Sequence, residues 1–211
     1  MTARPDPHVV IRPGTEADAD AAGSLHAERI TGGFLSFLGP GFLARLYRRI
    51  VRWPGAFLLV ADDGGAVVGF IAGTDDVRGL YRAFLRHDGL RASWSAAGRL
   101  ARSWRRVLET LRHGTSDGAG VGRGVELLAV AVDPGFQGRG IGAGLVQAFL
   151  ERVRAVPSDA AYVVVAAANT SAVGLYRRAG FVPGPEFELH AGTPSLLMQW
   201  DAAGAAAGDP S

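Results

Sequence analysis

Hydrophobic positions recur along the chain with two different periods, and each period predicts a type of secondary structure. Apolar residues three and four apart, with polar start signals and glycine stop signals, predict helices over residues 15–30, 42–51, 141–153 and 170–179. Shorter apolar runs bounded by turn residues predict strands over residues 8–12, 57–61, 66–73, 126–132 and 162–168, with two more around Phe187 and over 196–200.

The strands at 126–132 and 162–168 are apolar almost throughout, as ELLAVAV and YVVVAAA. Such runs are typical of strands that are covered on both faces. Helices alternate with the strands in the order β-α-α-β-β-insert-β-α-β-α-β-β. The sequence therefore predicts an α/β (α+β) fold, in which helices cover both faces of a mixed central sheet of about seven strands.

A length of 211 residues favours one compact domain with an elaboration. We expect that domain to span residues 8–200, with flexible tails at 1–7 and 201–211. The elaboration is an insert between the third and fourth strands, at about 74–124. Its apolar spacing predicts two helices, and it is rich in arginine. These arginines form either a solvated basic face or a lid that contacts an anionic substrate or the phosphates of a cofactor.

Composition excludes several kinds of chemistry. The chain contains no cysteine, which excludes disulfides, thiolate metal sites and a cysteine nucleophile. All 22 basic residues are arginine, and a net charge of only +2 gives no reason to expect a nucleic-acid partner. The chain has no apolar run of the ~20 residues needed to span a membrane and no secretory signal. We therefore expect a cytoplasmic protein, monomeric or homodimeric, that holds no metal.

A glycine-rich turn, residues 137–142 (QGRGIG), follows the strand at 126–132 and opens the next helix. Backbone N–H groups and the helix dipole converge there, which favours a bound phosphate. A P-loop would need a lysine, and the chain has none. A dinucleotide fingerprint, matched loosely by Gly138-x-Gly140-x-x-Ala143, would need an acidic residue after the following strand, where Ala168-Asn169 stands instead.

A third family matches better. The pattern Val132-Asp133-Pro134-x-x-Gln137-x-x-Gly140-x-Gly142 resembles the acetyl-CoA signature of GNAT acetyltransferases. Downstream, Asn169-x-x-Ala172-x-x-x-Tyr176-x-x-x-Gly180-Phe181 resembles the second signature of that family. The segment 66–70 resembles its third strand. The resemblance covers about residues 8–200, except for the insert.

The resemblance implies the GNAT fold and an N-acetyltransferase that uses acetyl-CoA, with direct attack by the acceptor amine in a ternary complex. In this family the fourth and fifth strands splay apart and free backbone groups for the pantetheine arm and the thioester. Asn169 would contact pantetheine or only cap its helix. The resemblance assigns the cofactor to Val130, Ala131, Val132, Gln137, Gly138, Arg139, Gly140, Ile141, Gly142 and Asn169.

Two residues are candidates for proton transfer. By resemblance, Tyr176 is the general acid near the sulfur of CoA; otherwise it is an aromatic residue of the core. Glu126 begins the central strand at the spacing where histone-acetylating members carry a catalytic glutamate, and it is the candidate general base. Otherwise it is a surface carboxylate, paired with Arg123. Rival bases are His26, Glu28, His113 and His190.

The acceptor is the least determined part of the prediction. Phe34 and Phe37 join the first two helices, where GNAT enzymes receive their acceptor, and they either line an acceptor wall or belong to the core. We expect a small-molecule primary amine, such as an amino sugar, an amino acid or a drug-like amine. The alternatives are a protein or peptide amine, or a non-catalytic module that senses acyl-CoA.

Overall fold

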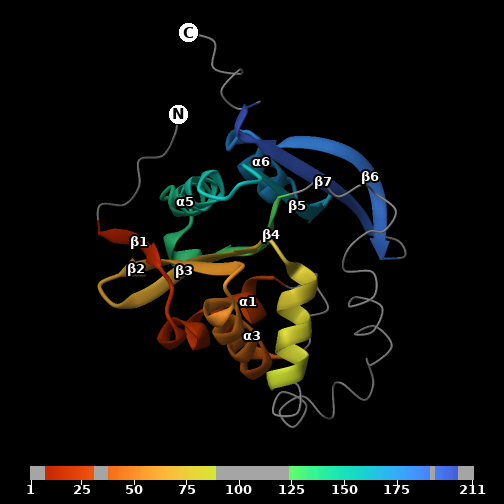
Figure 1. The fold of residues 1–211 in the computed structure, drawn as a ribbon. Helices are drawn as coiled ribbons and strands as arrows, with labels where there is room; N and C mark the ends of the chain where they lie inside the picture. Colours follow the sequence, from red (N-terminus) through yellow and green to blue (C-terminus); the bar gives the residue numbers. More distant parts are fainter. Residues whose placement is uncertain (1–7, 31–37, 89–123, 191–192, 204–211) are drawn as a thin grey trace.

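The computed structural model describes residues 8–30, 38–88, 124–190 and 193–203 (Figure 1). Its seven strands form one sheet in the order β1-β2-β3-β4-β5-β7-β6, in which only β4 and β5 pair in parallel. The strands are β1 (Val9–Pro13), β2 (Ala56–Asp63), β3 (Ala66–Thr74), β4 (Val125–Val132), β5 (Ala160–Ala166), β6 (Val182–His190) and β7 (Thr193–Asp201). The predicted mixed sheet of seven strands is confirmed.

Helices cover both faces of this sheet (Figure 1). On one face lie α5 (Ile141–Arg154) and α6 (Thr170–Arg178). On the other lie α1 (Ala19–Arg29), α3 (Pro40–Arg52) and a helix over residues 77–88. Each layer has its own core: Phe149 and Leu145 are fully buried in the first, and Tyr47 and Phe70 are buried in the second.

Local signals explain where several helices begin and end. Pro40 stands at the first turn of α3, where a missing N–H costs nothing, directly after Gly39. The Asn169 side chain caps α6, and Gly180 adopts a φ of 92°, the left-handed conformation that ends a helix. Thr15 precedes a short 3-10 turn, Glu16–Asp18, so the first α-helix begins later than expected, at Ala19.

The strand boundaries differ from the predicted ones by a few residues. β5 runs over Ala160–Ala166, two residues earlier than expected, because its register follows its pairing with β7. The sheet also continues past Trp200, the predicted end of the domain: Asp201 pairs with Ala160, and the N–H of Ala202 donates to the carbonyl of Asp159. The expected tail therefore begins at least two residues too early.

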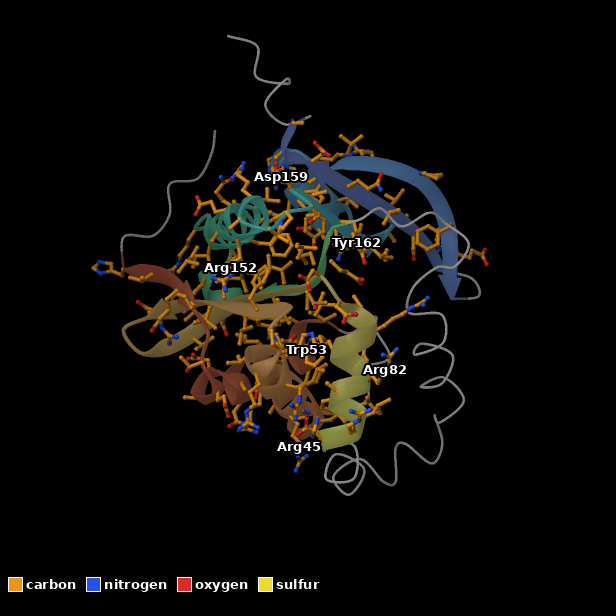
Figure 2. The ribbon with its side chains drawn as sticks, in the orientation of Figure 1. Arg45, Trp53, Arg82, Arg152, Asp159 and Tyr162 are labelled. Carbon is orange, nitrogen blue, oxygen red and sulfur yellow. The ribbon has the colours of Figure 1, made fainter. Side chains whose placement is uncertain are left out.

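The insert is described only in part. The helix over residues 77–88 is its first half, and it packs through Leu80 and Phe84 on the layer of α1 and α3. Arg82 is exposed on this helix (Figure 2). The second predicted helix, the aromatic pair Phe34 and Phe37, and both predicted tails except for residues 201–203 lie outside the described residues. No helix of the described part is both long and apolar enough to cross a membrane.

Candidate active site

The parallel pairing of β4 with β5 is short. It consists of two registered pairs, Val125 with Ala161 and Glu126 with Tyr162. Beyond that point β4 stays paired with β3 as far as Val132, whereas β5 stays paired with β7. The two strands therefore diverge, as the resemblance implied.

The divergence leaves backbone groups of β4 facing an opening. The N–H of Asp133 donates to the carbonyl of Val68 on β3, and alternate residues of a strand turn their N–H and C=O to opposite sides. Val132 and Val130 therefore direct their backbone polar groups away from β3, into the opening. The side chain of Gln137 reaches back to the same place, with its Nε2 donating to the carbonyl of Val132 at 3.3 Å.

A β-bulge in β4 decides which side chains face which layer. Ala72 pairs with Ala129 and Gly73 pairs with Leu127, so Leu128 is the extra residue. Leu127 packs on the layer of α5, whereas Leu128 packs on the layer of α1. Glu126, two residues before Leu128, shares its face and so points to the α1 layer.

The glycine-rich turn leads from β4 into α5. After a 3-10 turn, Pro134–Phe136, Gly138 has a φ of 77° and Gly140 a φ of 78°, which only glycine adopts readily. α5 then begins at Ile141, and its first N–H groups have no partner within the helix and no hydrogen bond from a capping side chain. A Cβ at Gly138 would meet nothing within 4 Å, so the space over this backbone is open. The turn therefore presents the N–H groups that the sequence predicted for an anion.

Arg139 lies folded over this turn. Its guanidinium donates to the carbonyl of Gly135 at 2.9 Å and stands 4.8 Å from the centre of the Phe136 ring. These contacts keep a positive charge beside the N-terminus of α5, where it adds to the attraction for a phosphate.

Glu126 lies half-buried where β4 and β5 part. The hydroxyl of Tyr162 donates to its Oε2 at 2.9 Å, and the two residues are register partners. Burial raises the pKa of Glu126 to about 7, although the hydrogen bond from Tyr162 acts in the opposite direction. A carboxyl group with such a pKa can both take and release a proton near neutral pH. The expected partner Arg123 lies outside the described residues.

Tyr176 lies in the opposite layer from Glu126. Its ring is buried and packs on Phe181, with ring centres 5.6 Å apart. Burial raises the pKa of Tyr176, so the phenol keeps its proton at neutral pH. Within the described part of the chain its hydroxyl makes no hydrogen bond, which leaves it free to donate. The two candidate proton-transfer residues do not meet, and the plane of the diverging strands runs between their faces.

Asn169 performs at least the structural task expected of it. Its Oδ1 accepts a hydrogen bond from the N–H of Ala172 at 3.1 Å, which caps α6. β5 ends three residues earlier, at Ala166, so Asn169 belongs to the turn and not to the strand.

The other candidate bases, as far as the structure describes them, are less suited than Glu126 to accept a proton from an acceptor. His26 is buried between Tyr47 and Phe70, with its Nδ1 2.7 Å from the Tyr47 hydroxyl, and burial lowers its pKa to about 4. It is therefore a neutral residue of the core. Glu28 is exposed, with Arg29 as its neighbour in an ion pair. His113 and the side chain of His190 lie outside the described residues.

Two tyrosines near Glu126 were missed as site residues. In the sequence, Tyr162 is only the first residue of an apolar strand, and Tyr81 lies in the insert without a predicted role. Tyr81 packs on the α1 layer, which Glu126 also faces. Burial raises the pKa of Tyr81, and the negative charge of Glu126 raises it further. One signal was available for Tyr162: it and Glu126 begin the two apolar strands that were expected at the centre of the sheet.

The sequence model of the acetyltransferase (GNAT) family matches residues 28–181, most of the chain. The match includes the strand, turn and helix described above. The chain belongs to the acetyltransferase (GNAT) family. The family, the fold and the enzyme class predicted from the sequence are thereby confirmed. No curated protein sequence matches this GNAT-family chain.

Solved structures share the fold of this acetyltransferase at low sequence identity. Arabidopsis thaliana NAA60 in complex with acetyl-CoA has a TM-score of 0.59 and 17% identity, over 93% of this chain and 99% of that one. Ribosomal-protein-alanine N-acetyltransferase from Brucella melitensis has a TM-score of 0.58 and 20% identity, over 91% of this chain and 99% of that one. Spermidine N-acetyltransferase from Vibrio cholerae has a TM-score of 0.58 and 15% identity, over 94% of this chain and 96% of that one.

Among the described residues, no cluster of three acidic or histidine side chains could hold a metal.

The raised pKa of Glu126 predicts a specific pH dependence of stability. The ordinary pKa of a glutamate is 4.5, and that of Glu126 in the folded protein is about 7. Between these two pH values the folded state binds more protons than the unfolded state, so the free energy of unfolding falls as the pH rises. Glu126→Gln keeps an acceptor for Tyr162 and removes the titration. Urea unfolding should therefore show the variant gaining about 1–3 kcal/mol relative to the wild type between pH 4.5 and about pH 8. If the free energies of unfolding of the two proteins changed with pH in the same way, the raised pKa of Glu126 would be contradicted.

Proposed function

We propose that this acetyltransferase moves the acetyl group of acetyl-CoA to the primary amine of a small molecule, by direct attack within a ternary complex. The observation that carries the proposal is the divergence of β4 and β5. It opens the sheet between an anion-binding turn and a carboxyl group that titrates near neutral pH. Acetyl-CoA would enter the opening from the layer of α5, and the amine would enter it from the layer of α1.

The donor side consists of the turn and the open edge of β4. The N–H groups at Gly138–Gly142 would hold the pyrophosphate of the cofactor, as the dipole and the glycine backbone favour. The outward backbone groups of Val130 and Val132 would bind the pantetheine arm and polarise the thioester carbonyl. Fixed donors of that kind are often the largest electrostatic contribution to acyl transfer.

The acceptor side is built around Glu126. An alkylamine has a pKa near ~10, so at neutral pH it is protonated and cannot attack. A base with a pKa of about 7 is partly ionised at neutral pH and fully ionised at alkaline pH, and its ionised form can take the proton. Glu126 points to the α1 layer, away from the turn, and so would meet the amine on the side opposite to the cofactor phosphates.

Tyr176 is the proposed acid. When the amine nitrogen bonds to the acetyl carbon, the carbon–sulfur bond breaks and the thiolate leaves. A phenol that is buried, protonated and without a hydrogen-bond partner among the described residues suits the protonation of that sulfur. An acetyl-cysteine intermediate is impossible in a chain without cysteine, which favours direct transfer.

A small acceptor is favoured by the helix over residues 77–88, which packs on the α1 layer, the layer that Glu126 faces. A long peptide would have less room there. The second candidate is a protein or peptide amine, because the similar structures include a ribosomal-protein-alanine N-acetyltransferase as well as a spermidine N-acetyltransferase. A cytoplasmic location and a monomer or homodimer belong to the same proposal.

A matched pair of substitutions tests the cofactor turn. A Cβ at Gly142 would lie 3.8 Å from Leu175 and Val132, an ordinary contact, so Gly142→Ala should fold and bind. Gly142→Glu also suits the first turn of a helix but puts a negative charge where phosphate belongs. Acetyl-CoA at 100 times its Kd should raise the Tm of the wild type and the alanine variant by about 5–10 °C. The glutamate variant should show no rise, and an equal rise in all three would exclude this turn.

The transfer itself is tested with a panel of amines, including polyamines, amino sugars, amino acids and peptides, by measuring CoA release and the mass of each product. We expect acetylation of a small amine, with kcat about 10²-fold lower in Tyr176→Phe and little change in the KM for acetyl-CoA. Products from peptides alone would favour the second candidate. Tight binding of acetyl-CoA with no product from any amine would favour a sensor, and an unchanged kcat would return Tyr176 to the core.

A further inference from the structure

We propose that Tyr162 is a positioning residue: its hydroxyl holds Oε2 of Glu126, so that Oε1 is the oxygen that receives the proton of the acceptor amine. The inference rests on the proposed function and names the part of the site that orients its base. The two side chains come from two strands, β4 and β5.

The position of the Tyr162 contact is set by the sheet. Glu126 and Tyr162 are the last registered pair before β4 and β5 diverge, and both side chains lie on the α1 face, since Ala161 and Val163 of β5 pack on the α5 face. The hydrogen bond of 2.9 Å therefore joins the two strands by their side chains at the apex of the opening. It fixes the carboxylate where an amine approaching a thioester in the opening would find it.

The direction of this hydrogen bond selects one carboxylate oxygen. Burial raises the pKa of Tyr162, and the charge of Glu126 and the hydrogen bond raise it further, so the phenol stays protonated and acts as the donor. Its proton occupies Oε2. Among the described residues Oε1 has no hydrogen-bond partner, and it is the oxygen left for the amine or for one bridging water.

Other polar groups around this subsite are engaged elsewhere. Thr74, the partner of Glu126 on β3, donates its hydroxyl to the carbonyl of Gly55. His26 on α1 is paired with Tyr47 on α3. Tyr81 differs: it is half-buried on the same layer, and its hydroxyl makes no hydrogen bond within the described part of the chain. Its ring and hydroxyl are therefore available to an ammonium group that approaches Glu126.

The arrangement gives a balanced proton path. The acceptor ammonium loses one proton to Oε1 of Glu126, which passes it to solvent, and its nitrogen then bonds to the acetyl carbon as the carbon–sulfur bond breaks. The thiolate takes a proton from the phenol of Tyr176, and the second proton of the attacking nitrogen leaves as the amide forms and restores that phenol through solvent. Tyr162 neither gains nor loses a proton. Its role is to keep the carboxylate oriented and to stabilise its charged form against the effect of burial.

Tyr162→Phe tests this role through the pH profile of kcat/KM for the amine. Without the hydrogen bond, burial alone acts on Glu126, so the acid limb of the profile should move to higher pH by about 1–2 units. At neutral pH, kcat should fall about tenfold or more, with the KM for acetyl-CoA nearly unchanged. The matched control is Tyr47→Phe, which removes the hydroxyl that bonds His26 in the same layer and does not touch Glu126. Its acid limb should coincide with that of the wild type.

Two further measurements separate the possible outcomes. In a Glu126→Gln background, Tyr162→Phe should lower kcat little further, because it acts through Glu126. The side-chain carboxyl of Glu126 can also be titrated directly by NMR, without any acceptor, and should titrate higher in Tyr162→Phe than in the wild type. An unshifted carboxyl, or an equal shift in Tyr47→Phe, would overturn the inference. A shifted carboxyl in a protein that acetylates no amine would instead overturn the proposed function and leave the positioning contact standing.

Discussion

The parallel contact between β4 and β5 ends after the pair of Glu126 and Tyr162, and the site depends on this short pairing. Each strand then stays with a different neighbour, β3 or β7, so neither can close the opening. Unpaired strand edges are ordinarily covered, because bare N–H and C=O groups are costly inside a protein. In the proposed function, the polar and extended arm of the cofactor would pair with these groups and cover the edge of β4.

The same geometry separates the two halves of the chemistry. The bulge at Leu128 lets Glu126 face the α1 layer, while Tyr176 stays in the layer of α5 and α6. Burial acts on both groups but with different results: it raises the carboxyl pKa to about 7 and keeps the phenol protonated. Base and acid can then stand on opposite sides of a thioester that lies between the strands.

The sequence predicted much of this fold because local signals agreed with the global pattern. The apolar runs at 126–132 and 162–168 identified the central strands, and the glycine-rich segment 137–142 identified the turn, where the structure shows a positive φ at Gly138 and Gly140. Register and bulges could not be predicted in the same way, because they depend on contacts between distant segments. The pairing of Tyr162 with Glu126 therefore emerged only from the structure.

The central claim, that the open edge of β4 receives the arm of acetyl-CoA, is tested most directly by amide hydrogen exchange with and without the cofactor. Backbone groups of Val130 and Val132 have no strand partner on that side, so their segment should exchange readily in the free protein. Acetyl-CoA should slow exchange in β4 from Leu128 to Val132 together with the turn at residues 137–143. Slowing at the turn alone, with β4 unchanged, would contradict the account.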